Sequence, residues 1–176
     1  MNKYVRKVLK QYYCKILYKI NSEKYKKVYP TFLKKLGINI SPNHFQGGHG
    51  FIAPDVLFDG SDFSLISIGK NTTISTQVIV LTHDFSISKG LQLLHEPDSG
   101  KFLKPVSIGE NCFVGLRTIL LPGTSIGDNV VIGAGAVVKG IIPDNVVVAG
   151  NPAKILCSTD DWARRHCELH DYVELM

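Results

Sequence analysis

A six-residue repeat runs through the middle of this 176-residue chain. Its aliphatic positions fall at strict intervals of six: Ile108, Val114, Leu120, Ile126, Ile132 and Val138. Small or slender side chains hold the position four residues after each of the first five: Cys112, Thr118, Thr124, Val130 and Ala136. A period of six matches neither an α-helix nor a simple alternating strand. It predicts a solenoid that turns a corner every six residues, with about 18 residues to a coil.

The repeat also carries motifs that point to a family. The runs I-G-E-N-C-F, I-G-D-N-V-V and I-G-A-G-A-V, closed by A-G-N-P-A-K-I-L, resemble the hexapeptide-repeat acyltransferases of the sugar O-acetyltransferase type. That type includes maltose, galactoside, capsule and lipopolysaccharide acetyltransferases. The resemblance extends from about Ile38 to Leu156. It implies an all-β solenoid, a left-handed parallel β-helix, with an N-terminal helical arm and a short C-terminal helix.

The repeat divides the chain into three expected domains. Residues 1–37 form a basic amphipathic helical arm, residues 38–156 the β-helix catalytic domain, and residues 157–176 a C-terminal helical tail. The run Ser158–Asp161 is a capping-box signature, which predicts where the C-terminal helix begins.

Two segments interrupt the solenoid. The repeat stops after Val80 and returns near Pro105, so residues 85–104 are expected to leave the solenoid as a long functional loop. The register also slips between Phe58 and Ile68, which predicts an outward bulge at Gly60–Ser64.

The N-terminal arm holds most of the positive charge. Residues 1–35 carry eleven Lys and Arg against Glu23 alone, or +10, so the net charge of +5 leaves −5 for the remainder. A stripe of apolar side chains predicts an amphipathic helix over residues 3–20: Val5, Leu9, Tyr12, Ile16 and Ile20. This helix is expected to rest on an anionic membrane surface, or to pack against the solenoid or a neighbouring subunit. A second short helix is expected around Thr31–Leu36. No recognised nucleic-acid module accompanies the basic residues.

Cysteine usage and hydropathy indicate the cellular compartment of the protein. The four cysteines (Cys14, Cys112, Cys157 and Cys167) show no paired metal-ligand spacing, which favours a reduced protein. No secretory leader and no run of 18 apolar residues is evident. We expect a cytoplasmic protein, placed at the inner face of the membrane if the arm binds lipid.

His83 is the expected catalytic residue. It lies in V-L-T-H-D, at the brink of the long loop, where the resemblance implies the catalytic histidine. An imidazole can take the proton of a hydroxyl that attacks a thioester and then return it to the departing thiolate. Asp55, Asp59 and Asp84 are candidate substrate-binding residues. Asp84 is next to His83 in an extended segment and so faces the other way, which disfavours direct pairing.

The acyl donor implied by the family is acetyl-coenzyme A. Leu116 and Ala134 are one predicted coil apart and are expected to stack, with Pro152 one coil further on. A thin pantetheine arm can lie along such a column of small side chains, and the resemblance assigns these positions to coenzyme A. It also assigns Lys139 and Lys154 to the nucleotide phosphates. His44 and His49 have the spacing of two zinc ligands in γ-class carbonic anhydrases, but no histidine precedes them to complete a site, so no metal is expected.

These observations predict an acetyl-coenzyme A-dependent O-acetyltransferase that acts on a saccharide hydroxyl in cell-surface polysaccharide biosynthesis. The family implies a homotrimer with active sites between subunits. One alternative is an N-acetyltransferase of a nucleotide-linked amino sugar. An alternative from another class is a catalytically silent hexapeptide-repeat scaffold, which would release no thiol from acetyl-coenzyme A.

Overall fold

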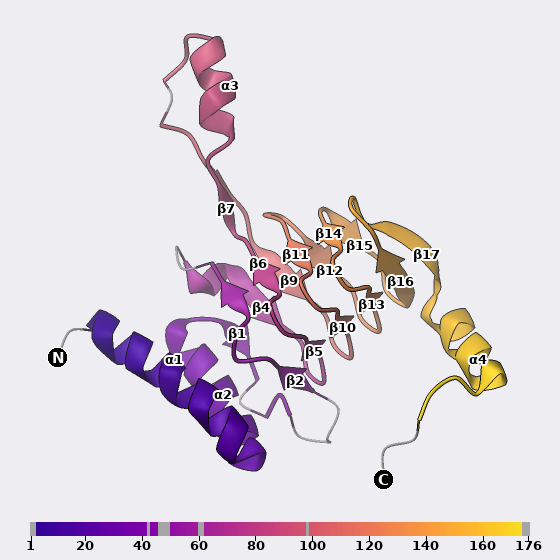
Figure 1. Ribbon diagram of the computed structural model, residues 1–176. Coiled ribbons are helices and arrows are strands. Elements are labelled where there is room, and N and C mark those ends of the chain that lie inside the picture. The colour runs from indigo at the N-terminus through magenta and orange to yellow at the C-terminus, as the bar shows by residue number, and fades with distance from the viewer. Residues whose placement is uncertain (1–2, 42, 46–49, 60–61, 98, 174–176) are drawn as a thin grey trace.

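The computed structural model describes residues 3–41, 43–45, 50–59, 62–97 and 99–173 (Figure 1). Short parallel strands stack into three sheets, which we call A, B and C. Sheet A contains β1 (Asn39–Ile40), β4 (Ile66–Ile68), β9 (Val106–Ile108), β12 (Ser125–Ile126) and β15 (Ile141–Ile142). Sheet B contains β2 (Phe51–Ile52), β5 (Thr73–Ile74), β10 (Phe113–Val114), β13 (Val131–Ile132), β16 (Val146–Ala149) and the antiparallel β17 (Lys154–Ser158). Sheet C contains β3 (Leu57–Phe58), β6 (Ile79–Val80), β11 (Ile119–Leu120) and β14 (Val137–Val138).

Each coil visits sheets A, B and C in turn, as the six-residue period predicts. Where the repeat is regular, residues paired across neighbouring coils are three hexads apart, as for Ile108 and Ile126 or Val114 and Ile132. The six aliphatic residues that define the period are all buried, none more than 3% exposed. They form a continuous core along the axis, so the predicted inward positions are confirmed.

The threonines at the slender inward positions form hydrogen bonds through their hydroxyl groups. Thr118 donates to the carbonyl of Gly133 at 3.2 Å, and Thr124 donates to the carbonyl of Val138 at 3.0 Å. Both threonines are buried. Since a buried hydroxyl without a partner would cost free energy, these bonds explain how threonine substitutes for an aliphatic side chain inside the column.

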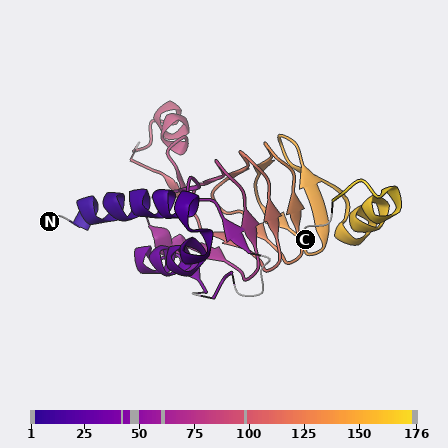
Figure 2. The same cartoon turned by 60° about the horizontal axis from the view of Figure 1, so that its bottom comes forward.

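The arm consists of two helices that lie side by side across one end of the solenoid, α1 (Lys3–Ile20) and α2 (Ser22–Leu36) (Figure 2). The helix expected over residues 3–20 is confirmed. The short second helix was predicted to start too late, because Asn21 caps α2 by accepting from the backbone of Lys24 at 2.8 Å. Pro30 lies inside α2. Tyr25 of α2 is buried and donates its hydroxyl proton to the carbonyl of Ile52 at 2.5 Å, which ties the arm to the first coil.

The predicted apolar stripe of α1 was wrong about which face is buried. Tyr12, Ile16 and Ile20 are 55–75% exposed, whereas Cys14 and Leu17 are buried. The side chains of Val5 and Leu9 are outside the described part. The reason is the neighbouring helix: α1 packs mainly against α2, and the side chains that face α2 are Cys14 and Leu17 rather than the stripe.

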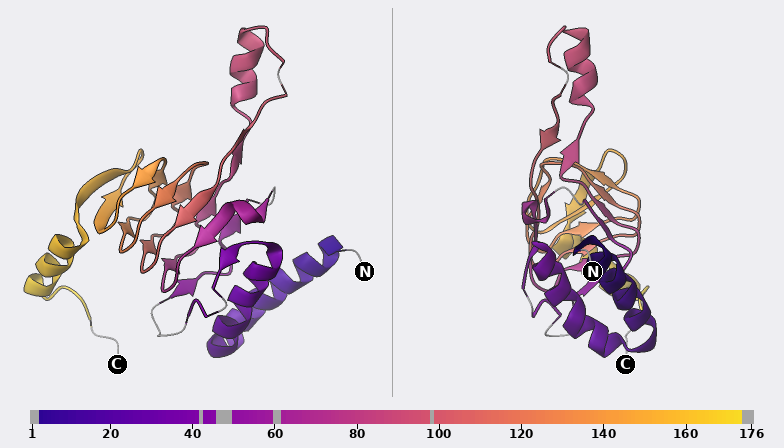
Figure 3. Two further views of the ribbon diagram at one scale, coloured as in Figure 1. Left: turned by 180° about the vertical axis from the view of Figure 1, so that it is seen from behind. Right: turned by 90° about the vertical axis from the view of Figure 1, so that its left-hand side faces the viewer.

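The long loop leaves the solenoid as a hairpin. Its stem is an antiparallel pair of β7 (His83–Asp84) and β8 (Phe102–Leu103), and its tip carries α3 (Ile87–Leu93). The hairpin projects well away from the coils in both views of Figure 3. The bulge expected at Gly60–Ser64 falls partly outside the described residues, and Phe63–Leu65 form a short 3-10 turn.

At the other end of the solenoid lies α4 (Thr159–Leu169). Ser158 caps it by accepting from the backbone of Asp161 at 3.0 Å, as the capping box predicts. His44, one of the two spaced histidines, is fully buried against the carbonyl of Thr72 at 2.8 Å, and burial lowers its pKa. His49 lies outside the described residues. Within the described ranges, no helix combines the length and apolar character needed to cross a bilayer.

Candidate functional site

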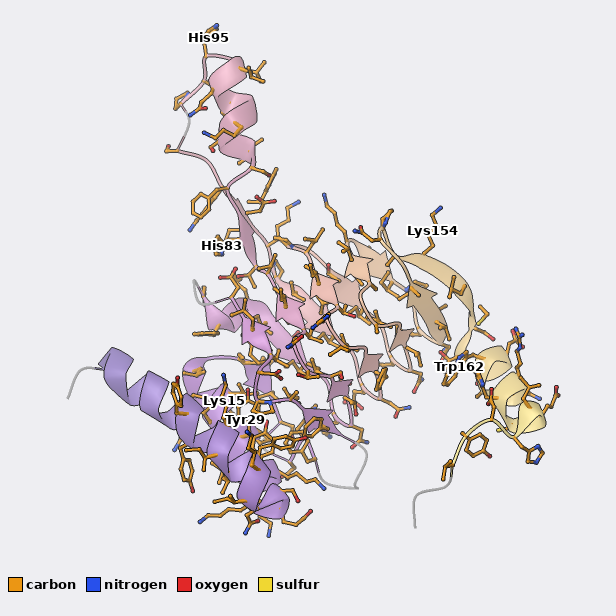
Figure 4. The ribbon with its side chains drawn as sticks, viewed as in Figure 1. Lys15, Tyr29, His83, His95, Lys154 and Trp162 are labelled. Carbon is orange, nitrogen blue, oxygen red and sulfur yellow. The ribbon has the colours of Figure 1, made fainter. Side chains whose placement is uncertain are left out.

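His83 lies at the base of the projecting hairpin (Figure 4), where the second coil turns from sheet C toward sheet A. Its Nδ1 is hydrogen-bonded to the carboxylate of Asp59, which occupies the same corner one coil earlier. Asp59 is buried and also accepts from the backbone of Thr82 at 2.9 Å, from the Thr82 hydroxyl at 2.9 Å, and from the backbone of His83 at 3.0 Å. These bonds fix the carboxylate, which in turn fixes the imidazole.

This geometry determines which ring nitrogen can act as a base. When Nδ1 donates to a carboxylate, the lone pair of the neutral imidazole is at Nε2. The His83 side chain is 27% exposed, so the ring reaches solvent while its Asp59 partner does not. The ring of Phe85 packs edge-on at 5.3 Å between centroids and restricts its rotation. A carboxylate that orients and supports an imidazole is the arrangement expected of a general base.

Asp84 faces away from His83, as its position in an extended strand predicts. It accepts from the backbone of Ser86 at 2.7 Å. Hydrogen bonds from Ser86, with smaller contributions from the charges of Lys139 and His83, hold the pKa of Asp84 below its usual value. Asp84 and Lys139 line a small hollow of about 140 Å³ on the far side of the stem from the histidine.

A column of residues follows the corner between sheets B and C. Leu116 and Ala134 stack as predicted, and the backbone of Gly135 donates to the carbonyl of Leu116 at 2.7 Å. Both side chains are exposed, and a Cβ placed on the neighbouring Gly135 would meet nothing within 4 Å. The column is therefore open along its outer side, which fits a thin, extended ligand.

The expected continuation of the column at Pro152 is wrong. The register from β13 to β16 pairs Ile132 with Val148, so this coil is shorter than the regular one by two positions. Gly150 therefore follows Ala134, and the carbonyl of Gly150 accepts from the backbone of Val137 at 3.0 Å. The chain thus keeps a small residue, glycine, at the end of the column.

In the other direction, Thr76 precedes Leu116 in the column. Strand β5 pairs with β10, and the backbone of Arg117 donates to the carbonyl of Thr76 at 3.2 Å. The column therefore begins on the second coil or earlier and continues to the last one.

The predicted site residues fall on two different edges of sheet C. The histidine edge, between sheets C and A, holds Asp59, His83, Asp84 and Lys139. The column edge, between sheets B and C, holds Asp55, Leu116 and Ala134, with Lys154 beyond its last coil on β17. Within a single subunit, His83 and the column therefore lie apart. Figure 4 shows His83 and Lys154 well apart, and His95 at the distal tip of the hairpin.

Asp55 lines a cleft of about 550 Å³ at the start of the column edge, between α1 and the first two coils. Its carboxylate accepts a short hydrogen bond from the Thr76 hydroxyl. The cleft also contains Lys15 and Lys19 of α1, which the sequence did not single out. The signal was their spacing of four, which places both on one face of the helix.

The sequence also did not predict that Asp59 orients His83. The two residues belong to different coils, and the slip in the register lies between them. A register counted across that slip could not place them at the same corner.

Comparison with known proteins identifies the family to which the chain belongs. Residues 105–139 match the family model described as the hexapeptide repeat of succinyl-transferase. Protein CapG of Staphylococcus aureus is 36% identical over 144 residues, which cover 81% of this chain and 78% of CapG. WbbJ of Escherichia coli, named for O-acetyl transfer in lipopolysaccharide biosynthesis, is 36% identical over 68% of this chain and 66% of its own length. The crystal structure of a maltose O-acetyltransferase from Clostridium difficile 630 superposes with a TM-score of 0.56 at 26% identity, covering 86% of this chain and 87% of that one.

The matches cover different shares of the relatives. WbbJ and two further relatives, 34–36% identical, are spanned over only 58–66% of their lengths. In contrast, the matches to CapG and to the galactoside O-acetyltransferase of Escherichia coli, which is 31% identical, exceed two thirds of both chains. The repeat, the three stacked sheets and these matches agree: the chain belongs to the family of hexapeptide-repeat acetyltransferases.

Proposed function

We propose that this protein transfers an acetyl group from acetyl-coenzyme A to a hydroxyl of a saccharide, with His83 as general base. The observation that carries the proposal is the Asp59–His83 pair, a buried carboxylate that fixes a partly exposed imidazole at a corner of the solenoid. Relatives named for O-acetyl transfer to maltose and in lipopolysaccharide biosynthesis support a saccharide acceptor and a role in cell-surface polysaccharide biosynthesis.

His83 performs the proton transfers of the reaction. Nε2 accepts the proton of the acceptor hydroxyl as its oxygen attacks the thioester carbonyl, and the same proton then goes to the departing thiolate of coenzyme A. Asp59 stabilises the imidazolium that exists between the two transfers. Bound acetyl-coenzyme A supplies an activated acetyl group. The open column of Leu116, Ala134 and Gly150 would hold its pantetheine arm, and Lys154 beyond the end of that column would meet its phosphates. Lys139 lies on the histidine edge and would meet them only from a neighbouring subunit.

Because His83 and the column lie on opposite edges of sheet C, we infer that the site forms between subunits of a homotrimer. The outward side chains of sheet C are all aliphatic: Leu57, Ile79, Ile119 and Val137. Those of sheet A include Ser67, Ser107 and Ser125. If sheet C faces a threefold axis along the solenoid, the histidine edge of each subunit meets the column edge of the next. Exposed Leu93 and Leu94 on the hairpin would also find a partner there.

The left-handed winding of the coils is part of the same proposal and follows from the family resemblance. The cytoplasmic location and the peripheral membrane contact through residues 1–35 stay predictions.

The direct test of the function is thiol release from acetyl-coenzyme A by the wild-type protein, against a panel of sugars, a nucleotide-linked amino sugar and serine. Release that requires a sugar hydroxyl supports O-acetylation. Release only with the amino sugar would replace it by N-acetylation. No release with any acceptor would favour the silent scaffold.

The proposed trimer predicts the effect of a charge on sheet C. Ile119→Lys is expected to convert a trimer into monomers, because three lysines would be desolvated near the axis. It is also expected to abolish thiol release, since each site needs two subunits. Sedimentation equilibrium measures the mass. Ser125→Lys, the outward position on sheet A, should leave both mass and activity unchanged, and a wild-type protein that is already monomeric would rule the trimer out.

The role of Asp59 predicts a second result. Asp59→Asn is expected to lower kcat by about 100-fold without changing KM for the acceptor, because the amide neither stabilises the imidazolium nor fixes the same tautomer. Steady-state thiol release separates the two constants. Asp160→Asn, an exposed carboxylate on α4, is the matched control. If KM rose and kcat held, Asp59 would instead bind the acceptor, as the sequence suggested.

A further inference from the structure

The cleft beside α1 has a definite place in the proposed active site. It lies on the column edge, where Pro54 and Thr76 of its wall occupy the first two levels of the same column as Leu116 and Ala134. Thr76 follows β5 and His83 follows β6, so both belong to the second coil. In a trimer with its axis along the solenoid, the neighbouring subunit's histidine edge therefore reaches the cleft at the level of its own His83. The cleft is next to where the acetyl group would be transferred.

Positive charge dominates this cleft. Lys15 and Lys19 lie on one face of α1, one helical turn apart, and both line it. Among the described carboxylates, none forms an ion pair with either ammonium. Asp55 contributes the opposing charge and already accepts the Thr76 hydroxyl. Two like charges at this spacing destabilise a helix, and α1 has no acidic residue to offset them. An anion held between the two lysines would remove that repulsion.

The rest of the wall suits a saccharide. Tyr18 and Phe51 stand 5.6 Å apart between ring centroids and form an apolar surface against which a sugar ring can pack. The carboxylate of Asp55 can accept a sugar hydroxyl. The volume of about 550 Å³ lies within the range of sites that enclose small molecules.

We propose that this cleft binds the acceptor saccharide and that the acceptor carries an anionic group, a carboxylate or a phosphate, bound by Lys15 and Lys19. The inference rests on the proposed acetyl transfer for its position beside the donor. It assigns a substrate-binding role to α1, a helix that lies outside the six-residue repeat. It also narrows the class of acceptor from saccharides in general to acidic saccharides.

The test compares three acceptors that differ in charge: glucose, glucuronate and glucose 6-phosphate. Wild type is expected to use at least one anionic sugar with kcat/KM about 10-fold above glucose, since hydrogen bonds to charged groups discriminate on that scale. Lys15→Gln/Lys19→Gln is expected to remove this preference by raising KM for the anionic sugar while kcat and the constants for glucose hold. Lys27→Gln removes a charge from α2 outside the cleft and should change nothing. Added salt should raise KM for the anionic sugar in wild type only.

The two anionic sugars distinguish a carboxylate from a phosphate. Equal use of glucose and both anionic sugars, unaffected by the lysine variants, would overturn the inference and leave acetyl transfer standing. If no sugar supports thiol release, the proposed function fails, and calorimetric titration of the whole protein with glucuronate and glucose 6-phosphate decides the inference separately. Saturable binding that the double variant loses and Lys27→Gln keeps would support an anionic saccharide site, and no binding would refute it.

Discussion

Replacing His83 by alanine is expected to lower kcat/KM for acetyl transfer by about 10²–10⁴-fold, the usual contribution of a general base. Nε2 of His83 is the proton acceptor in the proposed reaction, and Asp59, which holds Nδ1, cannot reach the acceptor in its place because it is buried one coil away. Thiol release from acetyl-coenzyme A measures the rate. Binding of acetyl-coenzyme A, measured by calorimetry, should change little, because the column edge is untouched in the variant.

A second histidine variant controls for general damage. His170 lies in the left-handed region at the end of α4, with φ of 48°, and is exposed. Asparagine tolerates that conformation, so His170→Asn should retain full activity. A His83→Ala protein that turns over at the wild-type rate would show that another group removes the proton, and the acetyl transfer mechanism would have to be rebuilt around it.

Gly115→Ala is expected to destabilise the solenoid by about 3 kcal/mol, at the upper end for overpacking. A Cβ at this position would lie 2.5 Å from the nitrogen of Ala134 and 2.7 Å from the carbonyl oxygen of Ile132, both backbone atoms of the next coil. The Ile132 carbonyl also accepts the interstrand hydrogen bond from the backbone of Gly115, 2.9 Å long, so moving it away would break that bond. The melting temperature should fall by roughly 6–12 °C for a chain of this size.

Gly90→Ala provides the matched comparison. A Cβ on Gly90 would meet nothing within 4 Å, and the residue lies inside α3. Alanine is the better helix former there, so the melting temperature should stay the same or rise slightly. If both variants melted like wild type, the coils would have to be spaced more loosely than the structure has them.

The regular part of the fold could be predicted because its period is enforced by close packing. Every sixth residue must be aliphatic to fill the core, and Gly115 follows Val114 where two backbones approach too closely for a side chain. The place where the chain leaves the solenoid could be predicted in the same way, because the repeat stops after Val80 and the hairpin begins there, whereas the role of His83 came from the family resemblance. The prediction failed where the coil length changed. Because the coil after Ile132 is shorter, Gly150 rather than Pro152 occupies the last position of the column, and no residue within the repeat indicates that change in length.

The site was harder to predict because it depends on contacts between distant segments. Asp59 and His83 meet only because the coils restore their register after the slip that follows Phe58. The buried face of α1 depends on α2, which covers Cys14 and Leu17. A stripe of apolar residues establishes that a helix is amphipathic, but several such stripes can coexist on one helix, and its neighbour selects among them.

The hairpin that begins at His83 returns to the corner from which it left. His83 pairs with Leu103 in the stem, and the backbone of Lys104 donates to the carbonyl of Thr82 at 2.9 Å. The solenoid strands before and after the insertion keep their regular partners in the neighbouring coils: β6 pairs with β11, and β9 pairs with β4. Residues 86–101 are therefore a replaceable insertion: natural variation or protein engineering can lengthen, shorten or exchange them while the phase of the coils stays the same. His83, the proposed general base, stays with the solenoid, and the part that projects beyond it is free to diversify.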